Sequence, residues 1–218
     1  MRLVAFDLDG TLVDTLPDLS YSLNISLEQM RLPVLTQDQV AVLLGNGAKR
    51  FCQEALPSDR KEDFPELYHR FLQNYSKNCC RSSRPYQGLS SILSTLRKEG
   101  VLLAVISNKP DAETIALIHS LFGISTFHYI SGGKESIPLK PDPASLDLAL
   151  NKLNVKRSDA IYIGDSEVDI QFAHLSGIPC ISVDWGYRSH AQLVEAGGSP
   201  IVSDTSTLHD LLMQWTNL

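Results

Sequence analysis

The sequence predicts an α/β protein with a doubly wound parallel sheet and an inserted helical domain. From residue 85 onward, short apolar runs alternate with segments whose apolar residues recur at helical spacing, which is typical of parallel strands joined by helices. The connection after the first apolar run is far longer than such a sheet needs. With 218 residues, the chain is long enough for one large core and a modest insertion.

The first strand is expected at residues 3–6, which are apolar and lead directly into Asp7-Leu8-Asp9-Gly10. Alternate side chains of a strand share one face, so the two carboxylates are expected to point the same way where the strand ends. Gly10 allows a sharp turn beside them. The same residues suit a plain turn followed by a helix cap, but ligands of open parallel sheets bind at this edge.

The next strand candidate, residues 101–107, begins about 90 residues after the first strand ends. A parallel crossover needs only about a dozen residues and one helix, and residues 89–96 already supply that helix. We therefore predict that residues 15–84 form a helical cap domain, while residues 1–14 and 85–218 form the catalytic core. An insertion after the first strand lies over the carboxyl ends of the sheet, which is the position of a lid.

Within the predicted cap domain, apolar residues recur at helical spacing. The first helix is expected to end at Pro33, and a second to start after Thr36, because Gln39 three positions later completes a capping box. Gly45-Asn46-Gly47 interrupts the helical pattern. The apolar stripes comprise Leu19, Leu23, Leu27 and Met30 in the first helix, and Phe64, Leu67, Tyr68, Phe71, Leu72 and Tyr75 in the last.

The core continues as alternating strands and helices. Gly123 and Gly177 are expected to end two of the helices, the second of which starts after Asp165. Further helices are expected around residues 146–153 and at the end of the chain. The expected strands after the first are residues 101–107, 128–131, 160–164, 180–183 and 201–202.

Charge and composition exclude several classes of partner. The net charge is −6 and no run of Lys or Arg occurs, so neither nucleic acid nor an anionic membrane is an expected partner. No apolar segment reaches membrane length and the N-terminus does not resemble a signal peptide, so we expect a cytoplasmic protein. Its expected oligomeric state is a monomer or a homodimer. The four cysteines lack zinc-site spacing and are expected to be reduced thiols.

Polar residues also follow other predicted strands. Ser107-Asn108-Lys109-Pro110 follows the second strand, Lys140-Pro141 precedes a helix, and Gly164-Asp165-Ser166-Glu167-Val168-Asp169 follows a later strand. A hydroxyl, an amide and the N–H groups of a helix start can hold a phosphate. Each cluster alone would also suit an ordinary helix cap, and a lone lysine such as Lys140 is usually exposed.

In order and position, these clusters and the Asp7-Leu8-Asp9-Gly10-Thr11-Leu12 motif resemble the four motifs of the haloacid dehalogenase superfamily, in particular its phosphatase branch. The resemblance implies a Rossmann-like haloacid dehalogenase core. Further motifs resemble the phosphoglycolate phosphatase family, whose members carry a small helical cap. These are Gly45-Asn46-Gly47-Ala48, Ser131-Gly132-Gly133 and Trp185-Gly186-Tyr187-Arg188. The last segment either lines the site or packs on the core as an aromatic loop.

If Asp7, Asp9, Asp165 and Asp169 converge, each ionised pair at ~4 Å costs about 4 kcal/mol at an effective dielectric constant near 20. A cation is therefore expected among them, and a set of oxygen donors favours Mg²⁺. The resemblance implies Mg²⁺ bound by Asp7, by the Asp9 carbonyl and by Asp165, with Asp169 bound directly or one contact away. Glu167 lies outside the matched positions.

The resemblance implies that Asp7 is the nucleophile and Asp9 the general acid and base of a phosphatase that forms an aspartyl-phosphate. The implied substrate is a small phosphate ester, most simply 2-phosphoglycolate. Its carboxylate would need a cation from the cap, for which Lys49 and Arg50 are the nearest candidates, although an exposed basic pair is an equal interpretation. The expected phosphate-binding residues are Gly10, Thr11, Ser107, Asn108 and Lys140.

Other functions fit parts of the pattern. A sugar phosphomutase shares the two acids and a similar lid, and a pyrophosphatase or a sugar-phosphate phosphatase shares the motifs. A receiver-like signalling module also combines carboxylates, Mg²⁺ and a lysine, but it needs no inserted helical region. An inactive phosphate-binding protein is a further alternative, although every expected acid and the lysine are present.

Overall fold

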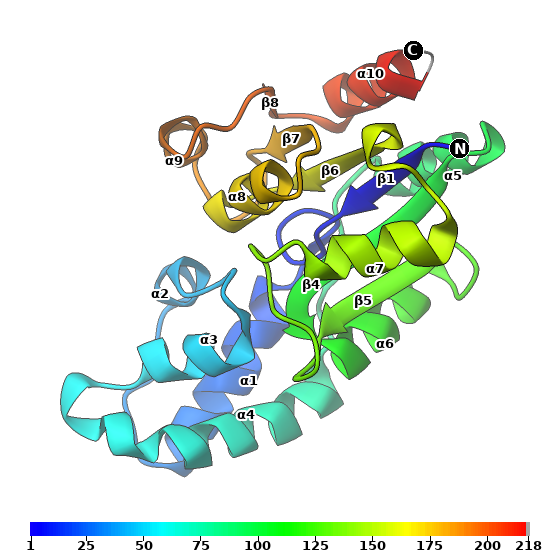
Figure 1. Ribbon diagram of the computed structural model, residues 1–218. Helices are drawn as coiled ribbons and strands as arrows, with labels where there is room; N and C mark the ends of the chain where they lie inside the picture. Colours follow the sequence, from blue (N-terminus) through cyan, green and yellow to red (C-terminus); the bar gives the residue numbers. More distant parts are fainter. Residues whose placement is uncertain (217–218) are drawn as a thin grey trace.

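Six parallel strands form the central sheet of the computed structural model, which describes residues 1–216. The strand order is β5-β4-β1-β6-β7-β8 (Figure 1), and β1 is hydrogen-bonded to β4 on one side and to β6 on the other. The predicted doubly wound parallel sheet is confirmed. The strands are β1 (Leu3–Phe6), β4 (Leu102–Pro110), β5 (Tyr129–Gly133), β6 (Ala160–Gly164), β7 (Cys180–Val183) and β8 (Ile201–Val202).

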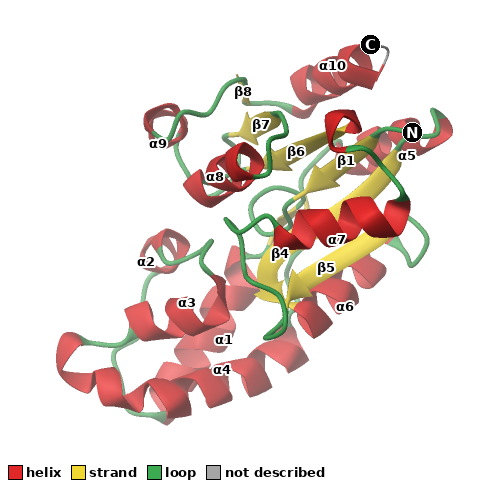
Figure 2. Ribbon diagram, in the orientation of Figure 1, coloured by secondary structure: helices red, strands yellow, loops and turns green. Residues whose placement is uncertain are grey.

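Helices cover both faces of this sheet (Figure 2). The side chains of Val4 and Phe6 pack against α5 (Leu89–Lys98), α6 (Asp111–Phe122) and α10 (Thr205–Thr216). Those of Leu3 and Ala5 pack with α7 (Ala144–Leu153) and α8 (Glu167–Leu175) on the opposite face. Alternation along a buried strand thus divides one short apolar run between two cores. Two short helices, η2 (Arg157–Asp159) and α9 (His190–Glu195), complete this part of the chain.

Two strand boundaries and one helix differ from the expected pattern. β4 runs three residues beyond the expected end at Ser107, because its pairing with β5 resumes at Pro110 after an irregularity. β5 likewise extends beyond its expected end, to Gly133. A Cβ atom at this position would lie 3.0 Å from the Asn108 carbonyl oxygen, so glycine allows the close approach of the two strands. α9 was not expected, although its capping box, in which Ser189 and Gln192 hydrogen-bond reciprocally, is visible in the sequence.

Residues 16–78, the helical insertion, hold four α-helices and one 3₁₀-helix. These are α1 (Leu16–Gln29), α2 (Gln37–Val42), α3 (Gly47–Ala55), η1 (Ser58–Asp63) and α4 (Phe64–Asn78). Their apolar stripes meet in a core of their own, separate from the two cores of the sheet. The capping box predicted at Thr36 is present, with Gln39 N donating to Thr36 Oγ1 at 3.2 Å and Thr36 N donating to Gln39 Oε1 at 2.9 Å.

The chain enters and leaves the helical insertion through a two-stranded antiparallel ladder. β2 (Val13–Asp14) pairs with β3 (Arg84–Pro85). The buried Asp18 carboxylate accepts hydrogen bonds from the backbone N–H groups of Ser82 and Ser83 at 2.8–2.9 Å, which fixes the returning segment. This ladder is too short to be predicted from periodicity. It holds the helical insertion at the carboxyl ends of β1 and β4 (Figure 1).

Among residues 1–216, no helix combines the length and apolar character needed to cross a membrane. Cys52, Cys79, Cys80 and Cys180 are free thiols, as expected. The Cys79 and Cys80 sulfur atoms lie 3.7 Å apart, the distance of a weak hydrogen bond rather than a disulfide.

Candidate active site

A pocket lies between the carboxyl edge of the sheet and the helical insertion. Both parts of the chain contribute to its walls: among the lining residues, the sheet side supplies all the charged groups, and the helical insertion supplies an apolar roof. The sheet side contributes Asp7, Asp9, Ser107, Asn108, Lys109, Lys140, Asp165, Tyr187 and Arg188, and the roof includes Leu19, Leu44, Ala48, Phe51, Phe71 and Tyr75.

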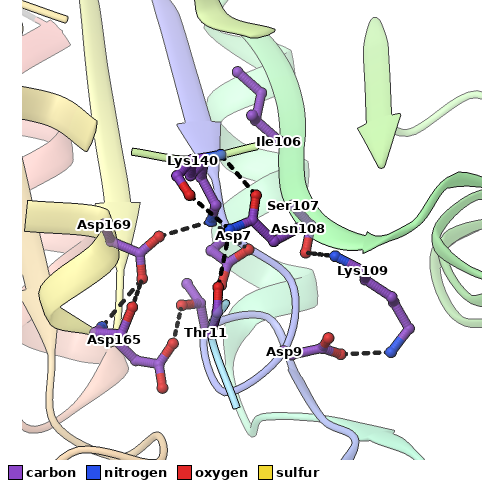
Figure 3. A network of polar contacts seen from close by, with 12 residues as sticks. Asp7, Asp9, Thr11, Ile106, Ser107, Asn108, Lys109, Lys140, Asp165 and Asp169 are labelled. Carbon is purple, nitrogen blue, oxygen red and sulfur yellow. Dashed lines mark hydrogen bonds and ion pairs between the residues drawn. The ribbon is translucent and has the colours of Figure 1, made fainter. Parts of the chain in front are cut away.

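Three buried carboxylates, those of Asp7, Asp165 and Asp169, converge at this edge (Figure 3). One oxygen atom of each lies within 4.8 Å of the others. Burial raises the pKa of Asp7 to about 6, an increase that Lys140 opposes and Asp169 reinforces. Burial, with Asp169 and Asp7 nearby, also holds the pKa of Asp165 well above its usual value. The cluster therefore has an excess of negative charge.

Lys140 offsets part of this charge. Its Nζ lies 2.7 Å from Asp169 Oδ1, 2.8 Å from Asp7 Oδ1 and 2.8 Å from the Tyr162 hydroxyl oxygen. Burial alone lowers the pKa of Lys140, but the two carboxylates outweigh burial and raise it. Lys140 is therefore a buried, charged side chain between the expected nucleophile and Asp169 (Figure 3).

The Asn108 side chain holds the backbone of Lys140 in place. Its Oδ1 accepts from Lys140 N at 2.8 Å, and its Nδ2 donates to Lys140 O and to Gly45 O, both at 2.9 Å. Both the acceptor and the donor of this amide are thus engaged with protein groups. Asn108 was expected to bind phosphate, and it does line the pocket. Its side chain, however, positions Lys140 and the Gly45 turn and presents no free donor to a phosphate.

Gly10 and Thr11 also differ from expectation, because neither lines the pocket within the described residues. Their backbone N–H groups close the local turn, on Val13 O and Leu8 O respectively. They support Asp165 instead. A Cβ atom on Gly10 would lie 2.2 Å from an Asp165 oxygen, and the Thr11 hydroxyl donates to Asp165 Oδ1 at 3.1 Å.

The carboxylate of Asp9 points away from the three-carboxylate cluster (Figure 3). Its Oδ1 accepts from Thr15 Oγ1 and from Lys109 Nζ, both at 2.7 Å. The sequence alone does not place Lys109 in the site, because a lysine at a strand end is normally expected to be exposed. The side chain is 1% exposed. Its position two residues after Ser107, on a strand that ends at the site, is the one signal in the sequence that points to the pocket.

Residues 185–188 were expected either to line the site or to pack on the core, and the segment does both. Trp185 packs on the core, while Tyr187 and Arg188 line the pocket. Trp185 packs against Tyr86 and donates to Thr11 O at 3.2 Å. Tyr187 N donates to Asp165 Oδ2 at 2.8 Å. Arg188 pairs with Glu167 at 2.8 Å and donates to Leu44 O at 2.8 Å, which joins the sheet side to the helical insertion.

Lys49 and Arg50 do not reach the pocket. Their side chains are 61% and 60% exposed and pair with Glu135 and Glu54 at the surface. The turn at Gly47 directs Ala48 and Phe51 into the pocket, so the two basic side chains between them lie on other faces of α3. The structure therefore does not support their expected contact with a substrate carboxylate.

The donor set at the acidic cluster fits a hard divalent cation. Carboxylate oxygens from three residues converge without any histidine or thiolate, which favours Mg²⁺ over softer metals. Asp7 Oδ1 is buried and accepts no hydrogen bond of good geometry from the described residues, although Lys140 Nζ lies 2.8 Å away. Asp169 is less available, because its two oxygens already accept from Lys140 and from Ser166.

A doubly wound sheet with buried carboxylates and a lysine at its carboxyl edge, beneath a helical insertion, has the architecture of a hydrolytic α/β enzyme. The chain belongs to the haloacid dehalogenase-like hydrolase family, whose family model matches residues 4–183.

Individual relatives are similar along almost the whole chain. A phosphoglycolate phosphatase of Haemophilus influenzae (strain 86-028NP) is 32% identical over 220 residues, covering 97% of this chain and 98% of the relative. One of Mesorhizobium japonicum is 34% identical over 189 residues, covering 85% and 83%. The crystal structure of a predicted phosphoglycolate phosphatase from Haemophilus somnus 129PT superposes with a TM-score of 0.88 at 29% identity, covering 97% and 98%.

Proposed function

We propose that this chain is a Mg²⁺-dependent phosphatase that hydrolyses 2-phosphoglycolate to glycolate and phosphate. The observation that carries the proposal is the pocket in which Asp7, Asp9 and Lys140 lie together beneath an apolar roof. Relatives named phosphoglycolate phosphatase match the chain over nearly its full length, which supports the choice of substrate.

In the first step, an oxygen of Asp7 attacks the phosphorus of the ester in line with the leaving oxygen. The new O–P bond forms as the ester O–P bond breaks, which yields an aspartyl-phosphate and glycolate. Asp9 gives its proton to the departing alkoxide oxygen. Its carboxylate is on the pocket wall and outside the acidic cluster, which suits a group that must meet the leaving oxygen.

In the second step, Asp9 takes a proton from water, and the resulting hydroxide attacks the phosphorus and frees Asp7 and phosphate. Lys140 and the Ser107 hydroxyl stabilise the phosphoryl oxygens; Ser107 accepts from Lys109 N at 3.3 Å and retains its own hydrogen for another partner. Asp7 and Asp165, supported by Asp169 and the Asp9 carbonyl, would hold Mg²⁺. The bound ion would neutralise charge on the transferring phosphoryl group.

We further propose that residues 15–84 act as a cap domain on a core formed by residues 1–14 and 85–218. The β2–β3 ladder at Val13–Asp14 and Arg84–Pro85 supports these boundaries, because both crossings between the two parts are side by side there. A small buried substrate needs such a roof, since excluding water strengthens the charge interactions around the phosphate.

Phosphate release from a substrate panel, with and without Mg²⁺, tests the function. The panel comprises 2-phosphoglycolate, hexose phosphates, nucleoside monophosphates and pyrophosphate. We expect Mg²⁺-dependent release with a kcat/KM at least about tenfold higher for 2-phosphoglycolate than for the other compounds. A flat profile would overturn the substrate assignment, and transfer of phosphate to a second sugar hydroxyl without release would overturn the phosphatase assignment.

Asp9→Asn is expected to lower kcat for 2-phosphoglycolate by about 10²- to 10⁴-fold, the usual contribution of a positioned acid and base. With p-nitrophenyl phosphate, whose phenolate leaves without a proton, the variant should release one equivalent of p-nitrophenol rapidly and then stall. Rapid-mixing kinetics would show this burst. Steady turnover at the wild-type rate would contradict the role of Asp9.

A further inference from the structure

Three cationic side chains line the pocket among the described residues: Lys109, Lys140 and Arg188. The three donors of the Lys140 ammonium already face Asp7, Asp169 and the Tyr162 hydroxyl. The Arg188 guanidinium pairs with Glu167 and donates to backbone carbonyls of the helical insertion. Protein groups therefore engage both of these cations.

Lys109 differs from the other two cations. Its ammonium carries three N–H donors, of which one is hydrogen-bonded, to Asp9 Oδ1 at 2.7 Å. Nζ also lies 4.6 Å from the centre of the Tyr75 ring, a cation–π contact that satisfies part of the remaining charge. Because the side chain is almost completely buried, bulk water is not a ready partner for the two remaining donors.

Tyr75, on α4 of the helical insertion, is a second incompletely bonded group in the same pocket. It is fully buried and stacks on Phe71 with the ring centres 5.3 Å apart, yet its hydroxyl has no hydrogen-bond partner within residues 1–216. Leaving a buried hydroxyl unpaired is unfavourable. Burial, with Asp9 next in importance, raises the pKa of Tyr75 well above its usual value, so the group remains a hydroxyl donor at neutral pH.

We propose that Lys109 and Tyr75 form the subsite for the second anionic group of the substrate, a carboxylate. The proposal rests on the proposed function and makes these two residues determinants of its specificity. A carboxylate accepts several hydrogen bonds, so it can accept from a free donor of Lys109 and from the unpaired Tyr75 hydroxyl together. The apolar neighbours Phe51 and Phe71 keep the interaction dry and therefore strong.

The contact between Lys109 and Asp9 limits the size of the substrate. Asp9 is the proposed proton donor to the ester oxygen, and its Oδ1 lies 2.7 Å from Lys109 Nζ. A ligand that reaches both groups must carry its ester oxygen and its carboxylate on the same carbon. 2-Phosphoglycolate has one carbon between them, whereas a hexose phosphate has no anion at that position. The subsite thus selects short 2-phosphocarboxylates.

The test measures kcat/KM of the full chain, in the presence of Mg²⁺, for 2-phosphoglycolate and for 2-hydroxyethyl phosphate. The second ester is similar in size but has a neutral hydroxyl in place of the carboxylate. We expect Lys109→Met to lower kcat/KM for 2-phosphoglycolate roughly 10- to 100-fold, mainly by raising KM. The ratio of kcat/KM for 2-phosphoglycolate to kcat/KM for 2-hydroxyethyl phosphate should fall nearly as much. Tyr75→Phe should lower the same ratio roughly 3- to 10-fold without lowering Tm, because it removes an unpaired hydroxyl. Lys134→Met, which removes a lysine outside the pocket, serves as the matched control.

The possible outcomes separate this proposal from the proposed function. A wild-type preference for 2-phosphoglycolate that persists in both Lys109→Met and Tyr75→Phe would overturn the subsite and leave the function standing. An equal loss on both substrates would also overturn the subsite, because it would show that Lys109 acts only through Asp9. A wild-type enzyme that does not distinguish the two esters would overturn the substrate assignment and the subsite together.

Discussion

Replacing Asp7 by asparagine is expected to lower phosphate release by about 10⁴-fold or more, the scale on which removal of a covalent nucleophile acts. The amide cannot form the acyl phosphate, and no other carboxylate of the described cluster has the same position. Asp7 directly follows β1 and has its Oδ1 beside Lys140, whereas Asp165 is held by Thr11 and Tyr187. Quenched assays with ³²P-labelled substrate should find labelled protein in the wild type and none in the variant.

The same variant is expected to keep its fold, and to show a pH-dependent gain in stability when Mg²⁺ is absent. Burial is the main reason that the Asp7 pKa rises from 3.8 to about 6. Because the folded-state pKa is above the unfolded-state value, ionising Asp7 costs stability, and this cost develops between about pH 4 and pH 6. At pH 8 the wild type therefore carries a penalty of up to about 3 kcal/mol that Asp7→Asn removes.

Urea unfolding in EDTA at pH 5 and pH 8 measures this difference. The difference in free energy of unfolding between Asp7→Asn and the wild type should be larger at pH 8. As a control, Asp147→Asn removes one partner of an exposed ion pair on α7 and should change this free energy by less than about 1 kcal/mol at either pH. Wild-type activity in Asp7→Asn would contradict the nucleophile assignment. A variant that unfolds more readily at pH 8 would contradict the charge argument.

The fold was predictable because its signals are local. Apolar runs such as residues 160–164, and the helical spacing of Leu19, Leu23 and Leu27, depend only on nearby residues. Asp7 and Asp165 were also predictable as a pair, because the carboxyl ends of parallel strands meet at one edge. Lys140 precedes a helix, so only the resemblance of its motif placed it there. The β2–β3 ladder was not predictable, because two residues per strand leave no periodicity to detect.

The cationic lining of the pocket illustrates what sequence patterns cannot resolve. Lys49 lies in the first turn of α3 and Lys109 lies two residues before the start of α6, but tertiary packing leaves the first exposed and buries the second. Gly10 and Thr11 show the same limit, since the use of their N–H groups in closing a turn depends on its exact shape. Local propensity identifies the candidates, whereas only packing decides which side chains face the ligand.

Lys140→Met is expected to have the largest effect on stability. Lys140 lies between Asp7 and Asp169 with its side chain 3% exposed, so its loss leaves two buried carboxylates without a partner. Breaking a buried ion pair from one side costs about 3–5 kcal/mol. The raised pKa of Lys140, due to these carboxylates despite burial, means that its stabilising charge is fully present at neutral pH. The cost should therefore be lower at pH 5, where protonated carboxylates no longer repel each other.

Mg²⁺ provides the discriminating measurement for this variant. If the three carboxylates hold the cation, saturating Mg²⁺ binds only the folded protein and should restore part of the stability lost in Lys140→Met. Activity should remain at least about 10²-fold below wild type even with Mg²⁺, since the metal does not replace the lysine charge beside the phosphoryl oxygens. Lys49→Met, at an exposed ion pair, should change the free energy of unfolding by less than about 1 kcal/mol. A loss of stability in Lys140→Met no larger than in Lys49→Met would show that the carboxylates do not need this lysine.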